Sequence, residues 1–305
     1  MIATCTLNPS LDYYLEFEDE IDDDKTNRST LEYYEAGGKG INVSVVLNNL
    51  GIPTKAFGFL GGFAKDFYIS LLSKYSYIQP NFTYIDGNTR INIKCVGKEN
   101  ISLNAVGPYI THESMENLKA KVLRMNEGDF FVLNGNTQPN LNDDVKEMLK
   151  ELIGNGVKVI VDTNYDLLKE IVELKPFLIK TTAPELESCY GELDDSKDVA
   201  KVAKELHELG AENVVIIYED EKAVLASSEG MYKCKFVHDE IVNSVGVGDS
   251  LVAGFIMNYI RSHDVVDSFR FGAACGSATA YSKSLATREK VDKCYEEVEV
   301  KKIDD

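Results

Sequence analysis

The stretch SKDVAKVAKELHELGAENVVII, residues 196–217, places a helical pattern directly before a run of β-branched residues. Its first part predicts an amphipathic helix, because apolar residues recur every three or four positions and share one face. These residues are Val199, Val202, Ala203, Leu206 and Leu209. Gly210 stands where such a helix would end. The run at 214–217 is apolar throughout, which is typical of a strand buried on both faces.

The same alternation of strand and helix extends through the middle of the chain. Short apolar runs occur at 130–133, 157–161 and 177–179, again separated by helical patterns. Strands that alternate with helices in this way predict a parallel, doubly wound sheet. With 305 residues, 44% of them hydrophobic, the chain is long enough to bury a large α/β core, and we expect one domain over 1–305.

The first hundred residues follow a different pattern. Segments near 11–36 and 88–106 are rich in aromatic and β-branched residues, whereas only 41–51 and 66–75 look helical. We expect the two β-rich segments to leave the main fold and to form a small sheet together. Such a sheet beside a nucleotide-binding fold is a candidate lid over the site. An additional sheet without that role is the alternative.

The net charge of −18 at pH 7 excludes some classes of partner. A surface this acidic repels nucleic acid and anionic membranes, so neither is expected as a partner. The six cysteines contain no CxxC pair and the four histidines show no metal-ligand spacing, so neither a disulfide framework nor a histidine-based zinc site is expected. No basic leader is present, and no apolar run approaches the roughly 20 residues of a membrane span, so we expect a cytoplasmic location.

The stretch NSVGVGDSLVAGF, residues 243–255, predicts a strand, a glycine loop and a largely buried helix. Gly246 and Gly248 would let the backbone approach a ligand closely, and the N–H groups at a helix N-terminus favour an anion. Asp249 would lie in the first helical turn, beside that anion. An ordinary acid at a helix start is the alternative, because GxGD alone is a weak motif and the chain has no Walker loop.

A second glycine cluster, EAGGKGINVS at 35–44, also precedes a helical pattern. A tight turn would explain its glycines but not Lys39 or Asn42. Three further polar residues belong to short motifs: Asp12 in LNPSLD, Arg28 in TNRS and Arg90 in TRIN. Each of them alone is explained as well by a solvated surface. Together they are the carboxylate, amide and cations that a sugar phosphate requires, and we expect the three cations to form one cup facing Asp249.

The motifs TLNPSLDY, NRS, GGKGINVS, GFLGGF, TRIN and NSVGVGDSLVAGF, in this order, resemble those of ribokinase-like sugar kinases. The phosphofructokinase B branch is the most similar, and the likeness runs from residue 2 to about residue 285. It implies a three-layer α/β/α sandwich with a mostly parallel sheet and a small β-sheet lid, which often also forms a homodimer. It further implies phosphorylation of a ketohexose phosphate by ATP with Mg²⁺. Fructose 1-phosphate is the favoured acceptor, and tagatose 6-phosphate is the alternative.

The resemblance also implies roles for single residues on the acceptor side. Asp249 would be the base that takes the proton of the acceptor hydroxyl. The backbone N–H groups of Gly246, Val247 and Gly248 would bind the transferred phosphoryl group. The sugar hydroxyls would be held by Asp12, Gly38 and Asn42, and the phosphate of the acceptor by Lys39, Arg28 and Arg90.

On the donor side, the resemblance places ATP against Gly248 and against the loop YEDEKA at 218–223, at Tyr218, Glu219 and Asp220. Glu185 in KTTAPE, 180–185, would hold Mg²⁺ through water. Both segments depart from the family pattern, since the loop has three acids and no glycine, and Thr182 stands where asparagine is usual. Acids that face the triphosphate would repel it.

These departures leave other functions open. A degenerate kinase fold that only binds sugar phosphate, as a sensor, would show an intact acceptor side and an altered donor side, although it would not need the base at 249. A dinucleotide-dependent dehydrogenase would need GxGxxG after its first strand, which this chain lacks. A kinase for an unphosphorylated sugar or nucleoside would leave the three cations without a shared anion.

Overall fold

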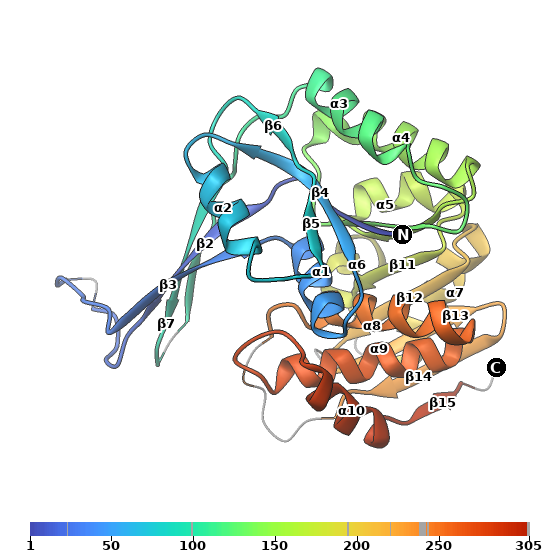
Figure 1. Cartoon of the computed structure of the whole chain (residues 1–305). Helices are drawn as coiled ribbons and strands as arrows, with labels where there is room; N and C mark the ends of the chain where they lie inside the picture. Colours follow the sequence, from blue (N-terminus) through green and yellow to red (C-terminus); the bar gives the residue numbers. More distant parts are fainter. Residues whose placement is uncertain are drawn as a thin grey trace.

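A large sheet forms the centre of the computed structural model, which describes residues 1–22, 24–98, 100–193, 195–219, 221–237, 242 and 244–303 (Figure 1). Its strands are β1 Ile2–Thr6, β4 Thr54–Gly61, β5 Ile78–Pro80, β6 Thr83–Ile85, β9 Phe130–Asn134, β10 Lys158–Asp162, β11 Leu178–Thr182, β12 Asn213–Tyr218, β13 Lys222–Ser227, β14 Gly230–Lys235 and β15 Val300–Lys302. The order is β15-β14-β13-β12-β11-β10-β9-β1-β4-β5, with β6 beside β4. The strands from β12 to β5 run parallel, and β13 to β15 extend one edge in antiparallel fashion.

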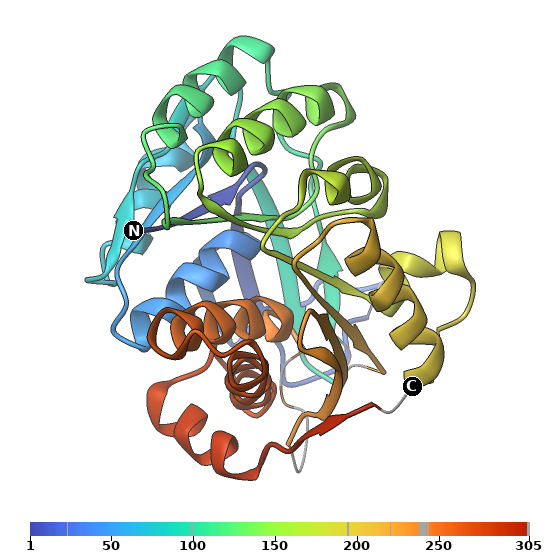
Figure 2. The same ribbon diagram turned by 90° about the vertical axis from the view of Figure 1, so that its right-hand side faces the viewer.

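Helices cover both faces of this sheet (Figure 2). They are α1 Lys39–Asn49, α2 Ala64–Leu72, α3 His112–Val122, α4 Asn142–Gly154, α5 Tyr165–Ile171, α6 Ala183–Tyr190, α7 Ser196–Leu209, α8 Val247–Ser262, α9 Val265–Ala280 and α10 Arg288–Glu297. In Figure 2 the blue α1 and the orange and red α8 to α10 lie on one side of the sheet, and the green α3 and α4 on the other. No helix within the described ranges is long and apolar enough to span a membrane.

Two of the apolar clusters lie on opposite faces of the sheet, because side chains alternate along each strand. Phe130 and Val132 of β9 pack with α1 and α8, whereas Phe131 and Leu133 point the opposite way and pack with α3 and α4. All four are buried. A strand that is apolar on both faces therefore belongs between two helical layers, and the predicted α/β/α sandwich is confirmed.

The local prediction for residues 196–217 is confirmed as well. Asp195 caps α7 by accepting hydrogen bonds from the N–H groups of Lys197 and Asp198, at 2.7 and 2.9 Å. The helix ends at Gly210, whose φ of 144° favours glycine. The prediction of a strand just before the glycine loop is wrong at Val245, which lies in a turn with Gly246, whose φ is 82°.

A separate small sheet has the strand order β3-β2-β7-β8 and lies to the left of the main sheet in Figure 1. Its strands are β2 Ser10–Glu16, β3 Leu31–Gly37, β7 Arg90–Val96 and β8 Ile101–Leu103. Tyr13 stacks on Tyr34 at 4.3 Å between ring centroids, and Tyr14 on Tyr33 at 4.8 Å, across the β2–β3 pair. The predicted small sheet is thus present and is built from the two expected segments.

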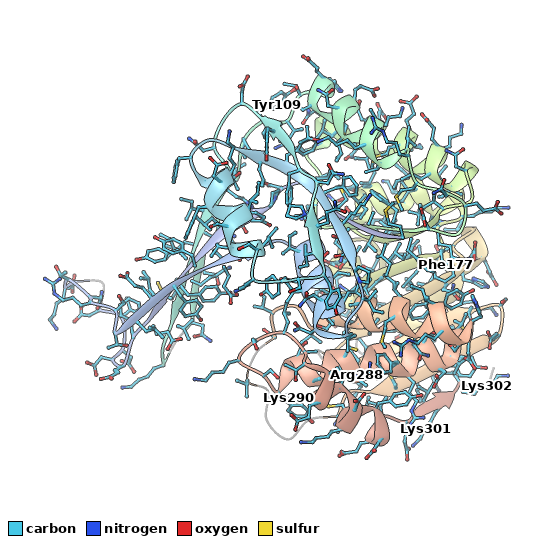
Figure 3. All side chains as sticks on the ribbon, viewed as in Figure 1. Tyr109, Phe177, Arg288, Lys290, Lys301 and Lys302 are labelled. Atoms are coloured by element: carbon cyan, nitrogen blue, oxygen red, sulfur yellow. The ribbon has the colours of Figure 1, made fainter. Side chains whose placement is uncertain are left out.

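The antiparallel edge of the main sheet ends in the short strand β15. Lys301 and Lys302 of this strand are exposed and extend outward in Figure 3. Charged side chains on an edge strand oppose pairing with another chain. Ligands of open α/β sheets bind at the carboxyl-terminal ends of the parallel strands.

Candidate active site

The N-terminus of α8, residues Gly246 to Asp249, is here called the α8 mouth. The first hydrogen bond within the helix runs from the N–H of Ser250 to the carbonyl of Gly246, at 2.8 Å. The N–H groups of Val247, Gly248 and Asp249 therefore have no partner inside the helix, and no side chain caps them. These groups and the helix dipole favour an anion at this point.

Asp249 is buried in the first turn of α8, with 5% of its surface exposed. Its carboxylate accepts hydrogen bonds from Nδ2 of Asn42 at 2.8 Å and from Nδ2 of Asn134 at 3.3 Å. Burial, followed by the nearby charge of Asp162, raises the pKa of this carboxyl to about 6. A carboxyl with a pKa this close to neutrality is suited to general acid–base work.

Asp162, at the end of β10, is fully buried between two lysines. Its Oδ2 accepts a hydrogen bond from Nζ of Lys180 at 3.0 Å, and its Oδ1 accepts one from Nζ of Lys39 at 3.2 Å. Burial acts to raise the pKa of Asp162, but the two ammonium groups outweigh it and lower the pKa. A Cβ on Gly248 would lie 2.7 Å from Nζ of Lys180, so the glycine lets this ammonium approach the α8 mouth.

Lys39 connects the second glycine cluster to the same acids. Gly38, with a φ of 138°, is the N-cap of α1, and Lys39 is the first residue of that helix. Its Nζ also lies 3.4 Å from Oε1 of Glu185. Burial acts to lower the pKa of Lys39, but the carboxylates of Asp162, Glu185 and Asp249 outweigh it and raise the pKa. The ammonium predicted to bind a substrate phosphate is thus paired with carboxylates of the chain.

Glu185 takes part in the site and in the capping of α6. Its Oε2 accepts hydrogen bonds from the N–H of Thr182 at 3.1 Å and from Oγ1 of Thr181 at 3.2 Å. The side chain of Thr182 completes a capping box with it. Thr182, which stands where the family has asparagine, is therefore engaged in helix capping, while Oε1 of Glu185 faces Lys39.

A cavity of about 330 Å³ lies at the α8 mouth, and its lining includes Lys39, Lys180, Glu185, Ile217 and Asp249. The side chain of Val247 belongs to the apolar core beneath α8, so its bulk is accommodated there. The cavity therefore combines free N–H donors, two ammonium groups and a buried carboxylate, which is a suitable environment for a phosphoryl group.

Asp12 and Arg90 lie near each other on the small sheet. Asp12 accepts a hydrogen bond from Nδ2 of Asn92 at 2.8 Å, and its Oδ2 lies so close to Gly37 that a Cβ there would be only 2.2 Å away. Arg90 donates to the carbonyl of Asn8 at 3.0 and 3.2 Å. Burial lowers the pKa of Arg90, and Asp12 acts in the opposite direction. The guanidinium is thus held by backbone at the end of β7 nearest to Gly37.

The expected cup of three cations is not formed in this structure. Lys39 is turned toward Asp162 and Glu185, and Arg90 is held by backbone carbonyls. Arg28 is exposed and belongs to the loop between β2 and β3. This loop lies at the end of the small sheet farthest from the main sheet (Figure 1). The length of these two strands separates Arg28 from the other two cations.

The loop after β12 also differs from expectation. Tyr218 packs into the apolar cluster of α7, and Ile217 lines the cavity, because neighbouring residues on a strand point to opposite faces. Glu219 instead forms an ion pair with Lys222 at 2.5 Å. The structure therefore places neither the Tyr218 nor the Glu219 side chain at this cavity. Asp220 lies outside the described residues.

Sequence reasoning missed three residues of the site: Asn134, Asp162 and Lys180. Asn134 and Asp162 end adjacent strands and are paired in register, and Lys180 lies on the next strand. Each follows or belongs to an apolar run that the sequence shows as a strand. The carboxyl ends of parallel strands meet at one edge, so a polar residue at the end of each predicted strand was the available signal.

A buried carboxylate, free helix N–H donors and lysines at the carboxyl edge of an α/β sheet are chemically suited to phosphoryl transfer, a reaction in which alignment and charge neutralisation provide most of the catalysis. Comparison with known families gives the same class. The pfkB family of carbohydrate kinases matches residues 7–291, and the chain belongs to this family. The resemblance in the sequence motifs is confirmed.

Individual relatives extend over nearly the whole chain. It is 36% identical to 1-phosphofructokinase of Borreliella burgdorferi, with 99% of each chain covered. It is 29% identical to D-tagatose-1-phosphate kinase of Bacillus licheniformis, with 98% of this chain and 99% of the relative covered. The solved structure of phosphofructokinase-2 from Escherichia coli with substrates and products has a TM-score of 0.90 at 25% identity, covering 97% and 98%. The protein is a sugar-phosphate kinase.

Proposed function

We propose that the protein transfers the γ-phosphoryl group of ATP to fructose 1-phosphate, giving fructose 1,6-bisphosphate, with Asp249 as the general base. The α8 mouth carries this proposal, because a buried carboxylate and free N–H donors share one helical turn. A relative named 1-phosphofructokinase supports the choice of acceptor. D-tagatose 1-phosphate replaces tagatose 6-phosphate as the alternative acceptor, because a relative of this chain is named for it.

In the proposed reaction, Asp249 accepts the proton of the 6-hydroxyl while that oxygen forms a bond to the γ-phosphorus. The bond from this phosphorus to the bridging oxygen of ATP breaks, and ADP leaves with the electron pair. The N–H groups of Gly246, Val247 and Gly248, with the ammonium of Lys180, stabilise the negative charge of the phosphoryl oxygens. Asn42 and Asn134 keep the carboxylate oriented through their N–H donors.

The residues present fit the Mg²⁺ that accompanies ATP in kinases. Asp162 and Glu185 already share one cation, the ammonium of Lys39. Mg²⁺ in such sites is held by one or two carboxylates together with substrate phosphates and water. Held by the two carboxylates, the ion would neutralise phosphate charge.

On the acceptor side, we assign the sugar hydroxyls to Asp12, Gly38 and Asn42. Asp12 lies against Gly37, directly before the start of α1, so these groups surround the same helix N-terminus. Arg90 lies near Asp12 and could bring its charge to the phosphate of the acceptor after a change in its backbone contacts. Arg28 would require closure of the small sheet or a second copy of the chain to reach this point.

The competing proposal, a sensor without turnover, loses its main support at the loop after β12. Glu219 and Glu221 each have a lysine partner, Lys222 at 2.5 Å and Lys235 at 3.2 Å. The charge of these acids is thus compensated locally, and repulsion of the triphosphate is reduced. A sensor would also have no use for the buried carboxylate of Asp249.

Asp249→Asn tests the proposed mechanism. ADP production from ATP, Mg²⁺ and fructose 1-phosphate should fall at least about 100-fold, because a positioned general base contributes roughly 10²–10⁴-fold. Asp264→Asn is the matched control, since Asp264 caps α9 through the N–H of Asp267 at 2.8 Å and asparagine is an equally good cap. Sugar-phosphate binding without any turnover that depends on Asp249 would establish the sensor instead. Parallel assays with D-tagatose 1-phosphate, fructose 6-phosphate and fructose would identify the acceptor.

We also propose that two copies of the chain associate through the small sheet. Large apolar side chains are exposed on it, among them Leu31 at 53% and Leu103 at 56%. Exposed apolar patches of this kind mark interaction sites. Light scattering should give twice the chain mass for the wild type, and Leu31→Lys with Leu103→Lys should give the single-chain mass.

A further inference from the structure

Lys39 and Lys180 bind the same carboxylate but are held differently. Nζ of Lys180 lies 3.0 Å from Oδ2 of Asp162, and its side chain is 4% exposed. Nζ of Lys39 lies 3.2 Å from Oδ1 of Asp162 and 3.4 Å from Glu185, and its side chain is 38% exposed. Lys180 is therefore a fixed counter-ion in the interior, whereas Lys39 reaches the two carboxylates from the solvent-accessible side.

Without any ligand, the two ammonium groups are already paired with two carboxylates, Asp162 and Glu185. The nearby carboxylate of Asp249 adds a third acidic group, which also acts on the pKa of Lys39. If the carboxylates took up Mg²⁺ while Lys39 kept its place, positive charges would lie close together at a partly buried site, which is unfavourable. Lys180 has little room to leave, because its Nζ is packed against Gly248. Lys39 is the group that can leave.

The start of α1 offers Lys39 a second anion. This helix has no acid in its first turn and no side-chain cap, so its N-terminus favours a negatively charged ligand. Gly37, two residues before Lys39, lies against Asp12 of the small sheet. An acceptor bound here would present its own phosphate to an ammonium located on the first residue of the helix.

We propose that Lys39 is an exchangeable counter-ion that couples the two sides of the site. In the ligand-free chain it neutralises Asp162 and Glu185, and it moves to the phosphate of the acceptor when these carboxylates take up Mg²⁺. The inference rests on the proposed function, because it assumes a phosphorylated acceptor. Since coupling between binding sites is reciprocal, Mg²⁺ must tighten the binding of sugar phosphate, and sugar phosphate must tighten the binding of the metal.

Calorimetry tests the coupling without turnover. The dissociation constant of fructose 1-phosphate is measured with EDTA and with millimolar Mg²⁺, in the absence of nucleotide. For the wild type we expect Mg²⁺ to tighten binding at least about fivefold, the lower end of typical coupling between sites. For Lys39→Met the two constants should be equal. Equal coupling in the two proteins, or none in the wild type, would overturn the proposal.

A reciprocal measurement uses Mn²⁺, followed by electron paramagnetic resonance. Wild-type affinity for Mn²⁺ should increase when fructose 1-phosphate is added. Lys39→Met should bind Mn²⁺ more tightly from the start and should not respond to the sugar phosphate. A wild type that takes up no Mn²⁺, even with the sugar phosphate present, would contradict the exchange.

Lys119→Met is the matched control, because Lys119 is likewise bonded to two carboxylates, Glu147 at 3.2 Å and Glu151 at 2.7 Å, outside the site. It should retain the coupling of the wild type. If the wild type turns over fructose 1-phosphate but Lys39→Met shows the same coupling between Mg²⁺ and sugar-phosphate binding, only the exchange is disproved. If the wild type neither binds nor phosphorylates the sugar phosphate, the proposed function fails as well.

Discussion

The α8 mouth and the turn after β12 lie at the same edge of the main sheet but hold their charges in opposite ways. At the α8 mouth, Asp249 and Asp162 are buried, and their partners come from α1, β9 and β11. In the turn after β12, Glu219 is paired with Lys222 only three residues away. The exposed fraction is 45% for the side chain of Glu219 and 35% for that of Lys222. One region depends on tertiary contacts and the other on local ones.

The difference indicates which departures from the family pattern are tolerable. A charge change in the turn can be compensated by a neighbour in sequence, as the pair of Glu219 and Lys222 shows. A charge change at the α8 mouth would have to be compensated by several elements at once. We therefore expect substitutions in the two regions to differ strongly in effect.

The largest effect on stability is expected for Asp162→Asn. The substitution leaves Lys180 buried without a carboxylate, and breaking a buried ion pair in this way costs about 3–5 kcal/mol of unfolding free energy. Urea unfolding measures the change. Asp198→Asn, which removes the partner of exposed Lys201 at 2.8 Å, is the control and should leave stability nearly unchanged. Equal midpoints for the two variants would show that the buried cluster does not hold the fold together.

The pH dependence of kcat/KM should report on Asp249. The carboxylate is the active form of a base, and burial followed by the charge of Asp162 raises its pKa to about 6. Activity should therefore fall about tenfold per unit below pH 6 and level off above it. Asn42→Ala removes a hydrogen bond that favours the carboxylate, so the fall in activity on the acid side of the profile should move to higher pH. An acid limb that stays in place in this variant would argue against Asp249 as the titrating group.

The smallest effect is expected in the turn after β12. Lys222→Met leaves the carboxylate of Glu219 uncompensated, and we expect the KM for ATP to rise roughly two- to fivefold with kcat unchanged, since exposed pairs contribute little. The double variant with Glu219→Gln should restore the wild-type KM. A large loss of kcat in Lys222→Met would mean that this turn takes part in the chemistry and that the two regions are more alike than their contacts indicate.

Much of the fold could be predicted from local patterns. The helix that ends at Gly210, the strand at 214–217 and the small sheet depend on periodicity and turn residues, which are properties of neighbouring positions. It is harder to predict which face of the sheet each strand residue points to, because a shift of one residue reverses the direction of a side chain. Tyr218, which the resemblance places at the nucleotide, points away from the cavity, and its neighbour Ile217 lines it.

The chemistry of the site was predictable only where a motif carried it. Asp249 and Lys39 stand in glycine-rich motifs, but the partner of each lies far away in sequence: Asn42 is 207 residues from Asp249, and Asp162 is 123 residues from Lys39. Pairings over such separations are set by the order of strands in the sheet. That order also explains why Arg28, at the far end of a long strand pair, is separated from Arg90 and Lys39.

The contact between α8 and α9 has a consequence for how the enzyme can be altered. A Cβ on Gly254 would lie 2.6 Å from Sγ of Cys275 and 2.9 Å from Cα of Gly272, so the two helices touch backbone to backbone. Gly254 is about 7.5 Å along the helix from Asp249. A single added methyl group on Gly254 would force α8 and α9 apart, and α8 carries Asp249 in its first turn. Substitutions meant to change which acceptor the enzyme phosphorylates should therefore avoid the contact between α8 and α9 and be made in the small sheet.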